Sequence, residues 1–167
     1  MRAVLATILL LAASPALAQD PATDRACSTV RVAIPPELAG WSQQTPVAAG
    51  IEAGGGANVT PGEAVLVSLH PAKHLTLRPA PKTVGANGGT LTLTIATPGT
   101  YRLALGGKAW VDLIRDGAAL TSTAHGHGPK CSGIRKMVDF ALDPGRYTIQ
   151  LSGSEATSVA LLVAKLA

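Results

Sequence analysis

From residue 63 onward, turns recur along this chain at a regular spacing. Runs rich in Val, Thr, Leu and Ile alternate with turn residues at a spacing of roughly 8–12 residues, as in sandwiches and barrels built from short strands. Asp116-Gly117 and Asp143-Pro144-Gly145 are the clearest turns, and the 18 Gly and 12 Pro among 167 residues favour strands and turns over helices. We therefore predict one all-β domain, a single antiparallel β-sandwich of jelly-roll or Greek-key type, with strands over 63–69, 74–78, 90–96, 100–106, 109–115, 118–123, 134–142, 146–152 and 157–165.

A repeat within this region predicts the core. Residues 98–107 and 144–153 share the pattern Pro-Gly-x-Tyr-x-aliphatic-x-Leu-x-Gly. Because side chains alternate along a strand, the tyrosine and the two aliphatic residues of each copy should line one sheet face. We expect one buried interior near Phe140 and either Trp110 or Val111, formed by Tyr101, Leu103, Leu105, Tyr147, Ile149 and Leu151. The residues between them should face the other way, namely Arg102, Ala104, Thr148 and Gln150.

The N-terminus has the pattern of a cleavable export signal over residues 1–18. Arg2 precedes an apolar run over 3–13, and Ala16-Leu17-Ala18 supplies a small-x-small cleavage site before Gln19. The run is shorter than the roughly 20 residues that span a bilayer. We expect a periplasmic or secreted protein of the bacterial envelope, with no transmembrane segment in the mature chain.

Residues 19–60 are expected to be tied to the β-sandwich domain at 61–167. Short strands are predicted over 30–34 and 47–52, with a loop or helical turn around Trp41 between them. A Gly-rich linker over 53–58 should follow.

Cys27 and Cys131 are the two cysteines of the chain. An oxidising compartment favours a disulfide between them, which would close a loop of about 105 residues. Two free thiols, or Cys131 as a metal ligand, are the alternatives.

From about residue 88 to the end, the order of strands, the two Pro-Gly-x-Tyr motifs and the long loop between them resemble the pre-peptidase C-terminal type domains of secreted bacterial peptidases. These small β-sandwiches are typically non-catalytic. The resemblance therefore implies the fold and a binding or secretion role.

Residues 121–136 are the most promising place for chemistry. His125 and His127 are one residue apart, so in extended backbone both rings point the same way and could chelate one ion. His70 and His74 form a second pair, and four imidazoles, or three with water, would suit copper or zinc. A solvated loop without a metal is the alternative.

The His-x-His pair is also similar to the first motif of cupins, a β-barrel family that includes many non-haem iron oxygenases. Gly117 precedes the pair at slightly long spacing, but Lys130 and Cys131 stand where that motif has a glutamate. His127 is the last histidine of the chain, so a second motif has no histidine to offer. The resemblance implies an iron-dependent oxygenase if His70 is recruited.

Three cations of the same segment form a candidate anion site, Lys130, Arg135 and Lys136, although such residues also serve as a solvated sheet edge. The 3% aromatic content leaves little material for stacking nucleic-acid bases, so we expect no nucleic-acid partner. The leading hypothesis is an exported, non-enzymatic binding or accessory protein for a small ligand or an envelope protein. The alternative is a metal-binding protein or metal-dependent oxygenase that uses the His125/His127 loop, with copper, zinc or iron.

Overall fold

The computed structural model describes Cys27 and residues 29–167, so the predicted export signal lies outside the described residues. The chain divides into Met1–Val30 and Arg31–Ala167, and the architecture described here is that of the second unit. Within the described residues, no helix combines the length and the apolar character that crossing a bilayer requires.

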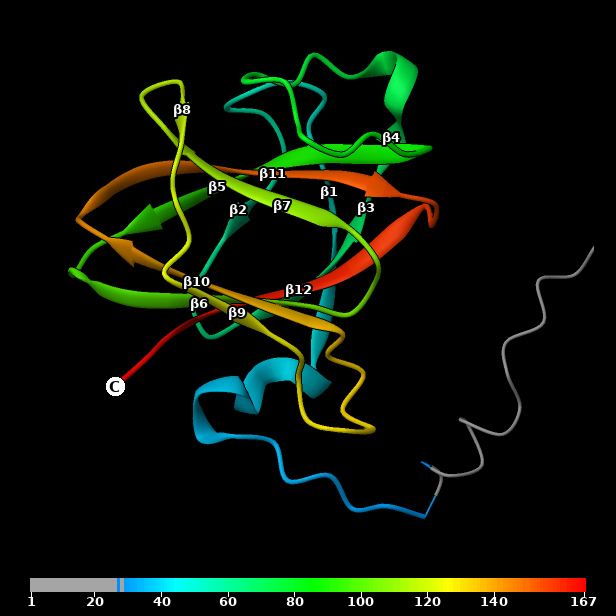
Figure 1. The fold of residues 1–167 in the computed structure, drawn as a ribbon, viewed down its shortest axis with the longest axis vertical. Coiled ribbons are helices and arrows are strands. Elements are labelled where there is room, and N and C mark those ends of the chain that lie inside the picture. The colour runs from blue at the N-terminus through cyan, green and yellow to red at the C-terminus, as the bar shows by residue number, and fades with distance from the viewer. Residues whose placement is uncertain (1–26, 28) are drawn as a thin grey trace, which may run out of the picture. The chain divides into compact units, whose positions relative to one another are not determined.

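Residues 31–167 form two mixed β-sheets packed face to face, which confirms the predicted all-β sandwich (Figure 1). One sheet contains, in spatial order, β1 (Gln44–Ala48), β3 (Ala64–Ser68), β12 (Ser158–Lys165), β6 (Gly99–Leu105), β10 (Lys136–Leu142) and β9 (Ala124–Gly126). The other contains β2 (Asn58–Val59), β5 (Asn87–Ile95), β11 (Gly145–Ser154), β7 (Trp110–Arg115) and β8 (Ala118–Ala119), and β4 (His70–Pro71) also pairs with β5. Neighbouring strands are antiparallel except in two pairs, β1 with β3 and β2 with β5.

The Pro-Gly-x-Tyr repeat builds the same strand entry twice, at β6 and β11. Gly99 and Gly145 have φ of 155° and 150°, a backbone region that favours glycine. The Tyr101 hydroxyl donates to the Thr97 carbonyl at 2.8 Å, and the Tyr147 hydroxyl donates to the Asp143 carbonyl at 2.7 Å. Each tyrosine thus ties its strand to the turn before it, as tyrosine corners do in other sandwiches.

The Asp116-Gly117 turn joins β7 and β8 as a two-residue hairpin. Arg115 pairs with Ala118, and both turn residues have positive φ, 51° and 78°. This conformation suits the right-handed twist of the flanking strands. Asp116 therefore has the turn role that the sequence predicts.

The main core lies between the two sheets and confirms the predicted interior. Its buried residues include all six repeat positions, together with Val111 and Phe140. Trp110 is half-buried and faces away from this core, since it neighbours Val111 on β7.

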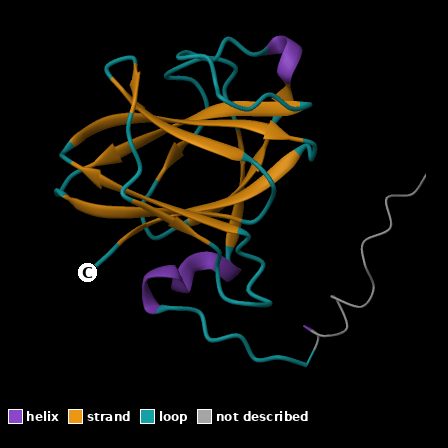
Figure 2. Cartoon of the chain, in the orientation of Figure 1, coloured by secondary structure: helices purple, strands orange, loops and turns teal. Residues whose placement is uncertain are grey.

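The outer faces of the sheets are covered by the short helices and loops, as Figure 2 shows. The 3₁₀ helix η1 (Pro36–Ser42) places Leu38 and Trp41 on one sheet, in a second buried cluster with Ala104 and Leu162. On the other sheet, the Gln150 amide donates to the Pro79 carbonyl at 3.0 Å, so residues after η2 (Ala72–His74) cover that face. The positions predicted to face away from the core do so, but two of them, Ala104 and Gln150, are buried beneath these covering segments.

Four predicted strands are wrong, displaced or shortened. The strand expected over 47–52 lies earlier, as β1, and residues 50 and 52 form only isolated bridges. Residues 30–34 form no strand, and Ile34 instead packs against the cluster under η1. Residues 74–78 also form no strand beyond one bridge between Thr76 and Glu52, because the segment begins in η2 and runs into prolines at 79 and 81. The strand expected over 118–123 ends at Ala119.

Candidate binding site

The two sheets leave an open edge where β7 of one sheet faces β9 and β10 of the other. Two hollows of about 370 and 520 Å³ lie there, and they share the side chains of Trp110, His125 and Lys136. We call the two hollows together the edge groove. Its other charged or titratable lining residues are Lys82, Lys108, Asp112, His127 and Arg135.

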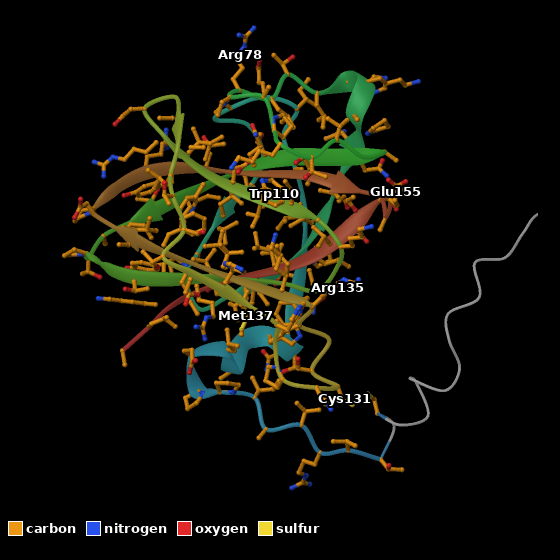
Figure 3. The ribbon with its side chains drawn as sticks, viewed as in Figure 1. Arg78, Trp110, Cys131, Arg135, Met137 and Glu155 are labelled. Atoms are coloured by element: carbon orange, nitrogen blue, oxygen red, sulfur yellow. The ribbon has the colours of Figure 1, made fainter. Side chains whose placement is uncertain are left out.

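Trp110 and Lys136 are the first residues of β7 and β10. Trp110 and Asp112 lie two residues apart on β7, so they share a face, and the Trp110 Nε1–H donates to Asp112 Oδ1 at 2.9 Å. Lys136 begins β10, and its Nζ lies 4.5 Å from the centre of the Trp110 ring, a cation–π contact. Figure 3 labels Trp110 on β7.

Burial lowers the pKa of Lys136 below its ordinary value of 10.5, and the charge of Asp112 only partly opposes that effect. A cation that is partly removed from water and lacks a close ion pair interacts more strongly with an incoming anion. Lys136 is therefore a groove cation whose charged form an anionic ligand would stabilise.

The edge groove has an excess of positive charge. Its lining includes four Lys or Arg side chains, and Asp112 is the single acidic residue among the described residues that line it. The ion pairs found in the described part of the chain involve Arg102 and Arg115, and none involves these four cations. Of the predicted anion site, Arg135 and Lys136 line the groove, whereas exposed Lys130 does not.

His125 and His127 both face the edge groove. His125 pairs with Val138 across β9 and β10, and because Val138 belongs to the main core, His125 faces the gap between the sheets. The His127 Nδ1 lies 2.8 Å from the Arg135 carbonyl oxygen. A carbonyl only accepts, so Nδ1 carries the proton and a neutral ring has its lone pair on Nε2.

His70 and His74 belong to a different part of the fold. His70 is on β4, where its Nε2 donates to the Ala49 carbonyl at 2.9 Å, and His74 ends η2. Residues 70–71 pair with β5 in one sheet, whereas β9 pairs with β10 in the other. Among Cys27 and residues 29–167, no three His, Cys, Asp or Glu side chains gather in a possible metal cluster, so the four histidines do not converge.

Cys27 and Cys131 form the predicted disulfide, so neither is a free thiol. The alternative in which Cys131 is a metal ligand is therefore wrong, because its sulfur is already bonded to another sulfur. Cys131 is labelled in Figure 3, in the loop before β10.

Asp139, a buried carboxylate on β10, has a structural role. Arg102 lies opposite it on β6 and donates to both of its oxygens, each at 2.8 Å. This hydrogen bonding raises the pKa of the Arg102 guanidinium above its ordinary value. Glu37 of η1 lies 3.6 Å from the same guanidinium, so the group links η1 to the sheet.

The groove is also lined by four residues that no sequence pattern had assigned to a site, namely Lys82, Lys108, Trp110 and Asp112. A Trp-x-Asp pattern at the start of a strand was the available signal, since it places an indole and a carboxylate on one face. Lys82 and Lys108 reach the groove from loops, whose path no periodic pattern predicts.

A scan against models of known protein families found no match, and a search of curated proteins found none either.

Proposed function

We propose that this chain is an exported, non-enzymatic binding or accessory protein of the bacterial envelope, and that its edge groove binds an anionic ligand. The single observation that carries the proposal is the half-buried Lys136 ammonium over the Trp110 ring, among further cations that have no close acidic partner. The disulfide fits an oxidising compartment, and the signal pattern at residues 1–18 supports export.

The Trp110 indole beside the groove cations favours an anion that also carries a ring. An indole offers a flat apolar face, and Arg or Lys side chains nearby pair with carboxylate or phosphate groups. The two adjoining hollows give room for more than one such unit. Inorganic phosphate and trigalacturonate are suitable probes, because the second combines carboxylates with sugar rings and the first has only the charge.

The test is a fluorescence titration of the disulfide-bonded protein at low salt. Trp110 should report the binding, while Trp41, buried under η1 with its Nε1–H bonded to the Ser132 carbonyl, should stay constant. We expect saturable trigalacturonate binding that Lys136→Gln weakens about tenfold, the effect of one charged hydrogen bond.

Lys130→Gln is the matched control, since Lys130 is an exposed cation of the loop before β10 and does not line the groove. It should leave the affinity unchanged. Absence of saturable binding, or equal weakening by the two variants, would contradict the proposal, since the second result indicates unspecific attraction to net charge.

A second candidate function is metal binding by His125 and His127, as a metal-handling protein or a cupin-like oxygenase. The observation that favours it is the His127 Nδ1–H hydrogen bond to a backbone carbonyl, an arrangement that orients metal-bound histidines. Copper or zinc uptake that is lost in the double variant His125→Ala/His127→Ala and kept in His70→Ala would support it. Equal heats for wild type and double variant in calorimetry would exclude it.

A further inference from the structure

A third hollow lies on the outer face of the sheet that contains β11, beneath the loop that covers it. The Ala72 amide donates to the Ala86 carbonyl at 2.8 Å and so closes residues 72–86 into a loop over β11. The hollow under this loop has a volume of about 200 Å³, and we call it the cover-loop pocket. Its side-chain walls come mainly from Leu75, Leu77, Pro81, Val84, Asn87 and Ser152.

Ser152 is the unusual member of these walls. It is 4% exposed, and its Oγ has no hydrogen-bond partner among the described residues. Ser154, two residues further along β11 and 1% exposed, donates its hydroxyl to the Ala156 carbonyl at 2.9 Å. Leaving a buried hydroxyl unpaired costs free energy, so such a group calls for a physical explanation.

The backbone of β11 places this hydroxyl on the pocket side. Leu151 faces the main core, so Ser152 faces the outer side of the sheet. The pairing with β5 is irregular between Leu151 and Ser154, and Gly153 has a φ of 66°. A Cβ at Gly153 would lie 2.7 Å from the Thr83 side chain, so glycine lets the cover loop pack on this bulge. Bulges of this kind are frequent beside binding sites.

The rest of the pocket indicates a small, neutral ligand. No charged side chain lines it among the described residues, and its walls are aliphatic apart from Asn87 and Ser152. Val84 is 78% exposed, the highest exposure among the large apolar residues described, and it leaves an apolar rim in solvent. The volume of about 200 Å³ exceeds that of an engineered apolar cavity of about 150 Å³ that binds benzene.

We propose that the cover-loop pocket binds a small, neutral, mainly apolar molecule whose hydroxyl or carbonyl group hydrogen-bonds to Ser152 Oγ. A hydroxyl both donates and accepts, so Ser152 can pair with either group. The pocket shares only Gly153 with the lining of the edge groove, so this inference does not depend on the proposed anion site.

Phenol and toluene form a matched pair of probes, since they differ by one hydroxyl. We expect phenol to shift the methyl NMR signals of Leu75, Leu77 and Val84 in a saturable manner. Ser152→Ala should weaken phenol binding about fivefold, the effect of one neutral hydrogen bond, without weakening toluene binding. Because the Ser152 hydroxyl has no partner to lose, the variant should be at least as stable as wild type.

Ser154→Ala is the control, since it removes a hydroxyl from the same strand outside the pocket. It should lower the unfolding midpoint and leave phenol binding unchanged. The proposal is overturned if phenol does not shift the three methyl signals, if Ser152→Ala binds phenol as tightly as wild type, or if Ser152→Ala is less stable than wild type.

Discussion

At the scale of single residues, Lys136 links stability to pH. Burial lowers its pKa in the folded protein below 10.5, so between the two pKa values the unfolded chain binds more protons. The free energy of unfolding therefore rises as the pH increases through that window, and below it this contribution is constant. Anion binding should fall through the same window, because the ammonium loses its charge.

Lys136→Met should remove that rise. Urea unfolding of wild type and variant at several pH values between 7 and 11 measures it as the difference between the two curves. Lys130→Met, at an exposed position in the loop before β10, should retain the wild-type slope. A Lys136→Met curve parallel to wild type over this range would show that the ammonium is not desolvated.

At the scale of elements, the two tyrosine corners predict a graded loss of stability. Tyr101→Phe and Tyr147→Phe each remove a hydroxyl that donates to a turn carbonyl, which should cost about 1 kcal/mol. The loss should be larger for Tyr147→Phe, because that hydroxyl also accepts from the charged Arg115 Nη1 at 3.0 Å, whereas the second contact of the Tyr101 hydroxyl, with Thr97 Oγ1, is longer at 3.4 Å and neutral. Chemical denaturation gives both values, and an unchanged midpoint in either variant would refute the role assigned to the repeat.

The same repeat shows how far the sequence could predict the fold. Alternation identified Tyr101, Leu103 and Leu105 as core because the side-chain period of a strand depends only on local geometry. The prediction of a strand over 30–34 was wrong because a strand also needs a neighbouring strand to pair with. The local residue pattern does not reveal whether such a neighbour is present.

The candidate site was harder to predict for a related reason. His125, Arg135 and Lys136 lie close together in the sequence and were recognised as a group. Trp110 and Asp112 approach them only because β7 and β10, which belong to different sheets, both begin beside the edge groove. The joint use of His70 was predicted from residue type alone, and sheet pairing separates it from His125.

At the scale of the whole molecule, the disulfide joins residues far apart in the chain. A bridge that closes a loop of about 105 residues restricts the unfolded state by roughly 4–5 kcal/mol in the chain-entropy treatment. The double variant Cys27→Ser/Cys131→Ser should therefore have a clearly lower thermal midpoint than oxidised wild type, and reductant should lower only the wild-type midpoint. Equal midpoints for wild type and variant would mean that the bridge contributes little.

We propose that the edge groove, and not the general positive charge, binds anions. Two-dimensional amide NMR of the oxidised protein, titrated with trigalacturonate, distinguishes the two. We expect saturable shifts with one common dissociation constant for the Trp110 indole N–H and the backbone amides of His125, Gly126 and Lys136. Small, unsaturated shifts spread over exposed basic residues such as Lys73 and Arg146, with none at Trp110, would contradict it.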